Sequence, residues 1–176
     1  MANGGPMRTA TRLGTWAAAI TVAISPVSTF EISGAAAEGT TRVPLQSDLR
    51  RCDFSLSTFA SVEERPRLGS GSAVIHVAGS RVIAEVQFFD QPSPNTHFDV
   101  GLIQEPRPSP VTCGPGAPGT AFTGMDTDGA ANGTATVQDT IRPGTTGVWV
   151  VVERPNAFSQ DPAEFYTSGF LVPVSS

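Results

Sequence analysis

Hydrophobic and polar residues alternate along much of the chain, which is typical of β-strands with one buried face. The clearest case is a pair of β-rich runs, Ser72 to Ala78 and Arg81 to Phe89, separated by Gly79-Ser80. A two-residue linker with glycine favours a tight hairpin, and pairing Ala78 with Arg81 sets its register. This register places apolar residues opposite one another on one face, namely Val77 and Val82, Ile75 and Ala84, and Ala73 and Val86. We predict that this face lies in the core.

Five further stretches predict strands, because each is rich in apolar residues and bounded by Gly, Pro, Asn or Ser. They are residues 52–57, 97–102, 134–141, 147–154 and 165–174. The apolar run Val148 to Val152 does not alternate, so we expect it to be the most buried strand, covered on both sides or central in a sheet. No stretch has a convincing helical period.

Seven or eight short strands punctuated by glycine and proline predict an all-β fold. We expect an antiparallel immunoglobulin-like β-sandwich with one disulfide, and the alternative is a small β-barrel. Residues 38–49 are polar and contain Pro44, so we expect an irregular leader there, followed by a single domain over residues 50–176. Because proline lacks an N–H donor, Pro106 to Pro110 cannot continue a ladder, which places Cys113 on a long loop or a short edge strand.

The first 37 residues have the organisation of an export signal. Arg8 and Arg12 give a positive start, Leu13 to Ile24 is apolar, and small residues at 35–37 suit cleavage. We predict a signal peptide over residues 1–37, with Met7 as an alternative start. The apolar run is too short to span a bilayer as a helix, so we expect a secreted or envelope protein without stable membrane insertion.

The chain has two cysteines, Cys52 and Cys113. In an oxidising compartment such a pair favours a disulfide, whereas a redox pair would have the spacing Cys-x-x-Cys. Closing a loop of about sixty residues stabilises a fold by roughly 4 kcal/mol in the chain-entropy model. We therefore predict a structural Cys52–Cys113 bond.

Charge excludes one class of partner. Without residues 1–37 the chain keeps 11 − 2 = 9 arginines and 16 − 1 = 15 acidic residues, a net charge of −6. An acidic domain repels phosphate backbones and anionic lipid surfaces, so we expect no nucleic-acid partner.

Candidate catalytic groups are few, because the chain has only two histidines. On the outward face of the predicted hairpin, His76 lies diagonally across from Glu85. His97 and Asp99 point to the same side of their strand. We interpret both pairs as solvent-exposed surface residues rather than as catalytic groups. A nucleophilic mechanism needs Ser or Cys beside an oriented base, and no Gly-x-Ser-x-Gly motif occurs. We predict no catalytic residue and no cofactor.

A calcium site is a further candidate, because Asp126, Asp128 and Asn132 gather hard oxygen ligands on one loop. A helix-loop-helix site read from Asp128 would need an oxygen ligand at Ala130 and a glutamate at Asp139. Asp, Asn and Gly also suit a tight β-turn, which is the competing interpretation.

Three segments carry a resemblance to known proteins: Gly119 to Gly129, Pro143 to Trp149 and Phe165 to Ser168. From about Cys52 to Val174 the chain resembles small exported proteins of actinobacteria, mycobacterial ones among them. The resemblance implies an extracytoplasmic β-fold and assigns no activity.

The leading functional hypothesis is a non-enzymatic module that binds an unknown protein or glycan. The alternatives are an envelope-directed hydrolase and a calcium-stabilised module. Long loops in compact domains are often functional, so we expect a partner to bind at the loop Pro106 to Gly119.

Overall fold

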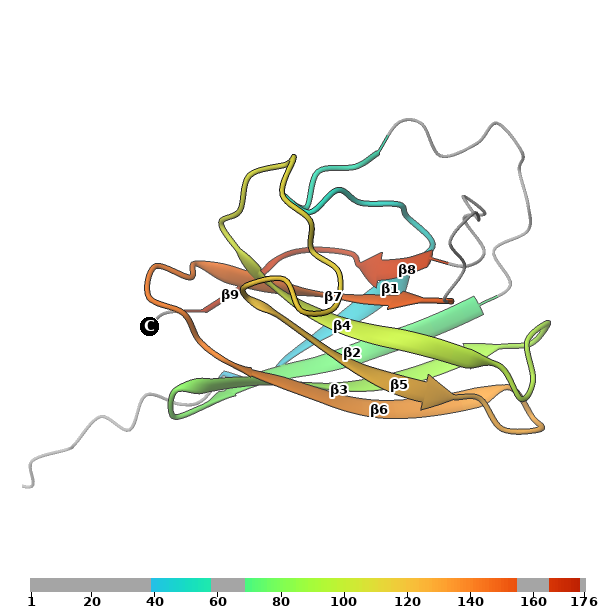
Figure 1. The fold of residues 1–176 in the computed structure, drawn as a ribbon. Coiled ribbons are helices and arrows are strands. Elements are labelled where there is room, and N and C mark those ends of the chain that lie inside the picture. Colours follow the sequence, from blue (N-terminus) through green and yellow to red (C-terminus); the bar gives the residue numbers. More distant parts are fainter. Residues whose placement is uncertain (1–38, 58–68, 155–164, 175–176) are drawn as a thin grey trace, which may run out of the picture. The chain divides into compact units, whose positions relative to one another are not determined.

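The computed structural model describes residues 39–57, 69–154 and 165–174, and their regular secondary structure is all β (Figure 1). The strands are β1 (Thr41–Gln46), β2 (Gly69–Ala78), β3 (Arg81–Asp90), β4 (His97–Glu105), β5 (Thr120–Asp126), β6 (Asn132–Thr140), β7 (Gly147–Glu153), β8 (Phe165–Ser168) and β9 (Val172–Pro173). In these ranges no helix is long and apolar enough to cross a membrane. The predicted signal peptide lies outside the described residues.

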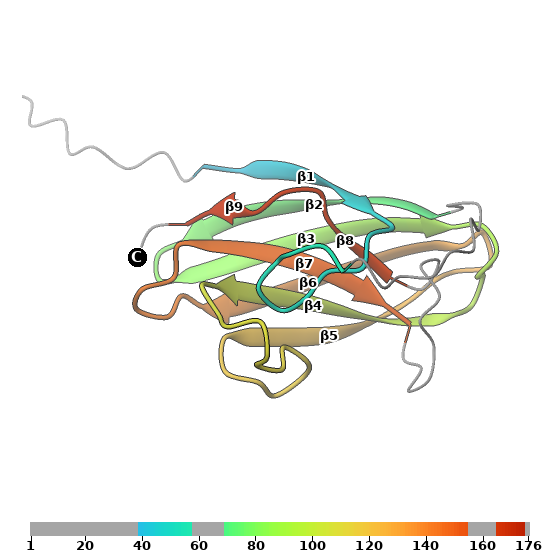
Figure 2. The same cartoon turned by 90° about the horizontal axis from the view of Figure 1, so that it is seen from above.

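Eight strands form one continuous antiparallel path in the order β5-β4-β7-β8-β1-β2-β3-β6. β9 pairs with β7 beyond the end of β8. The two strands at the ends of the path, β5 and β6, contact each other without a ladder, so the sheet curls into a nearly closed barrel (Figures 1 and 2). This near-closure brings the two edge strands next to each other, so they are less open to other chains than the edges of a flat sheet.

The predicted immunoglobulin-like sandwich is wrong, and the barrel that was the alternative describes the observed pairing. A sandwich consists of two separate sheets. Here β1 joins the two halves of the molecule, because Val43 pairs with Ala73 of β2 while Leu45 pairs with Ser168 of β8.

β1 itself corrects a second expectation, because it lies where we predicted an irregular leader. Val43 and Leu45 alternate with exposed neighbours and are buried in the core. Pro44 fits between them because its carbonyl faces away from β2 and accepts a hydrogen bond of 2.9 Å from the Gly169 N–H. The position where an N–H would be in another residue therefore faces away from β2, and the ladder between β1 and β2 loses no hydrogen bond at Pro44.

Residues 52–57 were predicted as a strand and form a looped excursion instead. An isolated bridge between Arg50 and Leu56 closes it, and Phe54 has a φ of 64°. A residue with positive φ interrupts an extended strand. The predicted strand over residues 165–174 is also divided, into β8 and β9.

The β2–β3 hairpin confirms its predicted register. Ala78 pairs with Arg81, and Ala73 pairs with Val86. Gly79 has a φ of 62°, as a tight turn requires. The predicted face is buried except for Val77, which is half-buried.

The barrel interior is packed with side chains from both halves of the strand path. Val, Leu, Ile and aromatic side chains form one cluster, in which the Phe88 ring meets Phe98 and Tyr166 edge-on at 5.0 and 4.8 Å between centroids. Such tilted contacts are favourable for aromatic rings.

β7 is buried on both faces, which confirms the prediction for residues 148–152. Val148, Val150 and Val152 point into the barrel. Trp149 and Val151 belong to a second cluster on the outside. Two loops cover this outer cluster, and without them a row of apolar side chains would face water.

These loops comprise residues 47–57, after β1, and residues 106–119, between β4 and β5. The predicted disulfide Cys52–Cys113 joins them across a sequence separation of 61. Figure 1 shows both loops on the same side of the barrel, above β7. A disulfide of this kind is typical of an extracytoplasmic protein.

Gln104 ties the end of β4 to the turn between β6 and β7, and its side chain is fully buried. Its amide nitrogen donates to Asp139 Oδ2 at 2.6 Å and to the Thr140 carbonyl at 2.9 Å. Its amide oxygen accepts from the Arg142 N–H at 2.9 Å and from the Thr145 hydroxyl at 2.8 Å. All four hydrogen-bonding positions of this amide are used.

Candidate functional site

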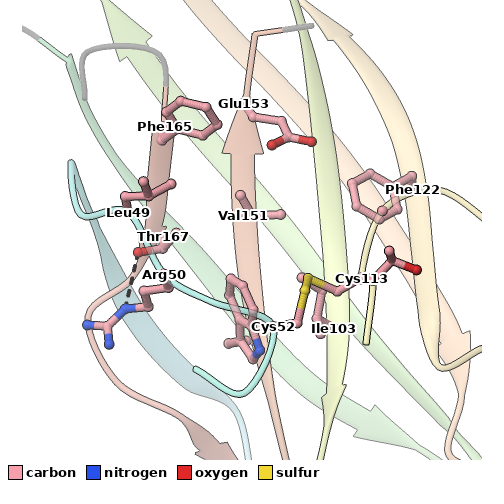
Figure 3. Close-up of a pocket in the computed structure, with 13 residues that line it drawn as sticks. Leu49, Arg50, Cys52, Ile103, Cys113, Phe122, Val151, Glu153, Phe165 and Thr167 are labelled. Carbon is pink, nitrogen blue, oxygen red and sulfur yellow. Dashed lines mark hydrogen bonds between the residues drawn. A yellow bond between two sulfur atoms is a disulfide. The ribbon is translucent and has the colours of Figure 1, made fainter. Parts of the chain in front are cut away.

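A pocket of about 320 Å³ lies on the outer surface of β4, β7 and β8 (Figure 3). Its floor is apolar and consists of Ile103, Phe122, Trp149 and Val151. The 47–57 and 106–119 loops form its walls, and the disulfide lies between them. The 106–119 loop, where a partner was expected, therefore contributes to the pocket through Thr112, Cys113 and Gly114.

The floor follows from the register of three strands. Val151 of β7 and Phe122 of β5 both lie opposite Gly101 of β4. A Cβ atom at Gly101 would come within 2.6 Å of the Phe122 ring and 2.8 Å of Val151 Cγ1. The absence of a side chain at this position therefore lets the Phe122 ring settle over β4.

Trp149 is 2% exposed, in keeping with the predicted burial of the run 148–152. Its indole N–H donates to Glu105 Oε1 at 2.9 Å, and its ring lies 5.7 Å from that of Phe54. Glu105 Oε2 accepts from the Arg107 N–H at 2.8 Å. Burial raises the pKa of Glu105, and the hydrogen bond from Trp149 opposes this shift. The indole is thus fixed to both loops.

Arg50 occupies one end of the pocket, but its charge is directed elsewhere (Figure 3). Its Nε donates to Thr167 Oγ1 at 3.2 Å, and Nη1 donates to the Phe54 carbonyl at 3.0 Å. The guanidinium lies 4.0 Å above the Phe54 ring and 3.8 Å from Asp48. Burial lowers the pKa of Arg50, and Asp48 opposes this shift. Arg50 thus fastens the 47–57 loop to β8.

Glu153 occupies the other end of the pocket. It lies opposite Asp99 on β4 and opposite Phe165 on β8. Burial raises the pKa of Glu153, and the negative charge of Asp99 raises it further. Across the described ranges no hydrogen-bond donor or cation pairs with this carboxylate.

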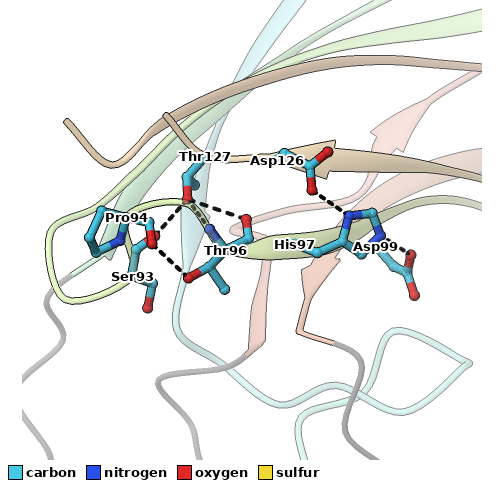
Figure 4. Close-up of polar contacts among 7 residues, drawn as sticks. All are labelled: Ser93, Pro94, Thr96, His97, Asp99, Asp126 and Thr127. Carbon is cyan, nitrogen blue, oxygen red and sulfur yellow. Dashed lines mark hydrogen bonds and ion pairs between the residues drawn. The ribbon is translucent and has the colours of Figure 1, made fainter. Parts of the chain in front are cut away.

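His97, the first residue of β4, lies between two carboxylates (Figure 4). Its Nδ1 is 2.7 Å from Asp126 Oδ1, and its Nε2 is 3.5 Å from Asp99 Oδ1. The side chain is 52% exposed, so the predicted exposure and the shared direction with Asp99 are confirmed. The hydrogen bond with Asp126 raises the pKa of His97 most, and partial burial opposes it.

We predict that Asp126→Asn lowers the pKa of His97, because it removes the largest cause of the upward shift. Because the pKa of His97 is raised in the folded state, the contact with Asp126 contributes its full stabilisation at pH values below the unfolded pKa of 6.5. This stabilisation is lost as the pH rises through the pKa of the folded state. NMR titration of the His97 ring measures the effect, with Glu85→Gln on β3 as the control. Identical titration curves for Asp126→Asn and wild type would contradict it.

The calcium candidates do not point to a common centre. Asp126 contacts His97. Asp128 Oδ1 accepts from the Ala130 and Asn132 N–H groups at 2.8 and 2.9 Å, and these bonds, led by Asn132, lower the pKa of Asp128. This is the geometry of a turn that caps its own backbone. Within residues 39–57, 69–154 and 165–174, no three His, Cys, Asp or Glu side chains are grouped to hold a metal.

The other sequence candidate, His76 with Glu85, lies on the outer face of the β2–β3 hairpin. His76 pairs with Ile83, and Glu85 pairs with Val74, so the predicted diagonal is present. Neither residue lines the pocket.

Comparisons of this chain with protein-family models, curated proteins and solved structures find no match.

Proposed function

We propose that this domain is a non-enzymatic binding module that holds a small molecule with a largely apolar body in the pocket beneath its disulfide-linked loops. The observation that carries the proposal is the apolar floor, which lies outside the barrel core and is walled by both loops. Ligand sites in proteins have volumes of about 300–1,000 Å³ and are mostly apolar, with few polar groups. The pocket of about 320 Å³ is at the lower end of this range.

The floor favours an apolar ligand over a glycan. Sugar hydroxyls need hydrogen-bonding partners, and burying them without such partners is unfavourable. The polar atom of the floor, the Trp149 indole nitrogen, already donates to Glu105. Ile103, Phe122 and Val151 offer only hydrocarbon.

The proposal places this binding outside the cytoplasm, in the medium or the cell envelope. The Cys52–Cys113 bond supports that location, because disulfides persist in oxidising compartments. The predicted signal peptide over residues 1–37 supports it independently.

A neutral apolar dye tests the proposal directly. We expect N-phenyl-1-naphthylamine to bind saturably, with its fluorescence as the readout, and Thr112→Trp to weaken binding about tenfold, because the indole fills space in the pocket. Val111→Trp is the matched control, since Val111 is exposed on the same loop and does not line the pocket. We expect its affinity to equal that of the wild type.

Two results would overturn the proposal. One is the absence of saturable dye binding to the wild-type domain. The other is equal weakening by Thr112→Trp and Val111→Trp, which would locate the dye outside the pocket.

A further inference from the structure

The carboxylate of Glu153 lies at one end of a pocket whose floor is apolar. Burying a charge is unfavourable unless a partner compensates it. Among the residues described, Glu153 has neither a hydrogen-bond donor nor a cation beside it. Its neighbour across β4 is Asp99, which carries the same charge. The fold thus holds an unpaired carboxylate at the end of the pocket.

Among the described residues, neither Arg50 nor His97 pairs with Glu153. Arg50 is directed toward Thr167 and the 47–57 loop, at the other end of the pocket (Figure 3). His97 contacts Asp99 and Asp126, and it does not line the pocket. With Asp99 and Glu153 on adjacent strands, the field at this end attracts a cation.

Aromatic rings flank the same carboxylate. Phe165 lies directly opposite Glu153 on β8, and Figure 3 draws Phe122 on the other side of Glu153 from Phe165. The face of an aromatic ring attracts a cation through its quadrupole, and the attraction grows when water is excluded. A carboxylate between two rings is therefore complementary to an organic cation rather than to a neutral or anionic group.

We infer that the ligand of this pocket is a small organic ammonium compound, whose cationic nitrogen pairs with Glu153 and whose apolar body covers the floor. This inference rests on the proposed function and specifies its ligand class. A bare metal ion fits less well, because it prefers several oxygen ligands and would leave the apolar floor empty.

Three ligands of one shape separate charge from hydrophobicity: 4-phenylbutylamine, 4-phenylbutan-1-ol and 4-phenylbutyrate. We expect the amine to bind about tenfold more tightly than the alcohol, the increment of one partly desolvated ion pair, and the acid to bind most weakly. Trp149 fluorescence or calorimetry measures the three affinities. Trp149 is suited to this because it lines the pocket and the other tryptophan, Trp16, lies within the predicted signal peptide.

Glu153→Gln tests the pairing residue. We expect this variant to bind the amine and the alcohol equally while keeping wild-type affinity for the alcohol. Glutamine has nearly the same shape as glutamate and lacks its unpaired charge. We therefore also expect a melting temperature no lower than that of the wild type at neutral pH. Glu85→Gln, on the exposed face of β3, is the matched control and should keep the preference for the amine.

Acid gives an independent readout. Lowering the pH protonates Glu153, so the preference for the amine should decline as pH falls through the raised pKa of this residue. Among the described residues, Asp99 of β4 and Phe165 of β8 lie opposite Glu153, and His97 contacts Asp99. In Glu153→Gln the affinities for amine and alcohol should remain equal throughout this range.

The outcomes separate the two proposals. Binding of the alcohol with no preference for the amine would overturn the ammonium inference and leave the binding function intact. No binding of any of the three ligands would overturn both. A preference for the amine that survives in Glu153→Gln would exclude Glu153 as its partner. A lysine-containing peptide that binds more tightly than 4-phenylbutylamine would show that the cation belongs to a protein, which also contradicts a small-molecule ligand.

Discussion

Replacement of Cys52 and Cys113 by serine should lower the free energy of unfolding by about 4 kcal/mol, because the bond closes a long loop in the unfolded chain. The sequence separation of the two cysteines is 61. Urea denaturation followed by circular dichroism measures the loss. Wild-type protein with its disulfide reduced is the matched control and should unfold with the variant. A double variant as stable as the oxidised wild type would contradict the prediction.

The same variant should lose ligand binding before it loses the barrel. The cysteines lie outside the inner core, whereas the floor residues Trp149 and Val151 depend on the two loops for their cover. We therefore expect a β-rich circular dichroism spectrum in the absence of denaturant, with dye binding at the pocket reduced about tenfold or more. This pattern would show that the disulfide serves the pocket as well as the fold.

Gln104→Met should be comparably destabilising, by about 3 kcal/mol or more, because it keeps the shape of the side chain and leaves several hydrogen-bonding groups without a partner. The affected groups are the Arg142 N–H, the Thr140 carbonyl, the Thr145 hydroxyl and the Oδ2 atom of Asp139.

Gln138→Met is the control for this substitution, because Gln138 is exposed on β6 and should tolerate the change within about 0.5 kcal/mol. Urea midpoints of the two variants provide the comparison. Equal midpoints would mean that the buried amide of Gln104 has no special role in stability.

The parts of the fold that could be predicted are those that depend on a local pattern of apolar and polar residues. The register of the β2–β3 hairpin follows from a period of two around Gly79-Ser80, and the burial of β7 follows from five consecutive apolar residues. The closure of the barrel has no such local pattern. It depends on Leu45 pairing with Ser168, far along the chain, and the same alternation of side chains serves sandwiches and barrels alike.

β1 was missed for a related reason. Its six residues include Pro44, which argues against a strand when it is judged by composition alone. Only the neighbours of Pro44 show that its missing N–H faces the side of the strand away from β2.

The candidate site was only partly predictable. The cysteine pair and the 106–119 loop were evident from the sequence, whereas the floor combines residues of three strands around Gly101. Glu153 did have a signal, because an acidic residue directly follows the buried run 148–152. Asp126, the partner of His97, was considered only as a calcium ligand, since β5 had not been predicted.

The position of the pocket on the outer wall of the barrel has an evolutionary consequence. In barrels that enclose their ligand, a change of specificity also alters the packing that keeps the protein folded. Here the interior is filled by its own side chains, and the pocket belongs to a separate layer. Substitutions at rim positions such as Leu49, Thr112 and Phe165 can therefore diversify ligand choice among descendants of this chain while the scaffold is inherited unchanged.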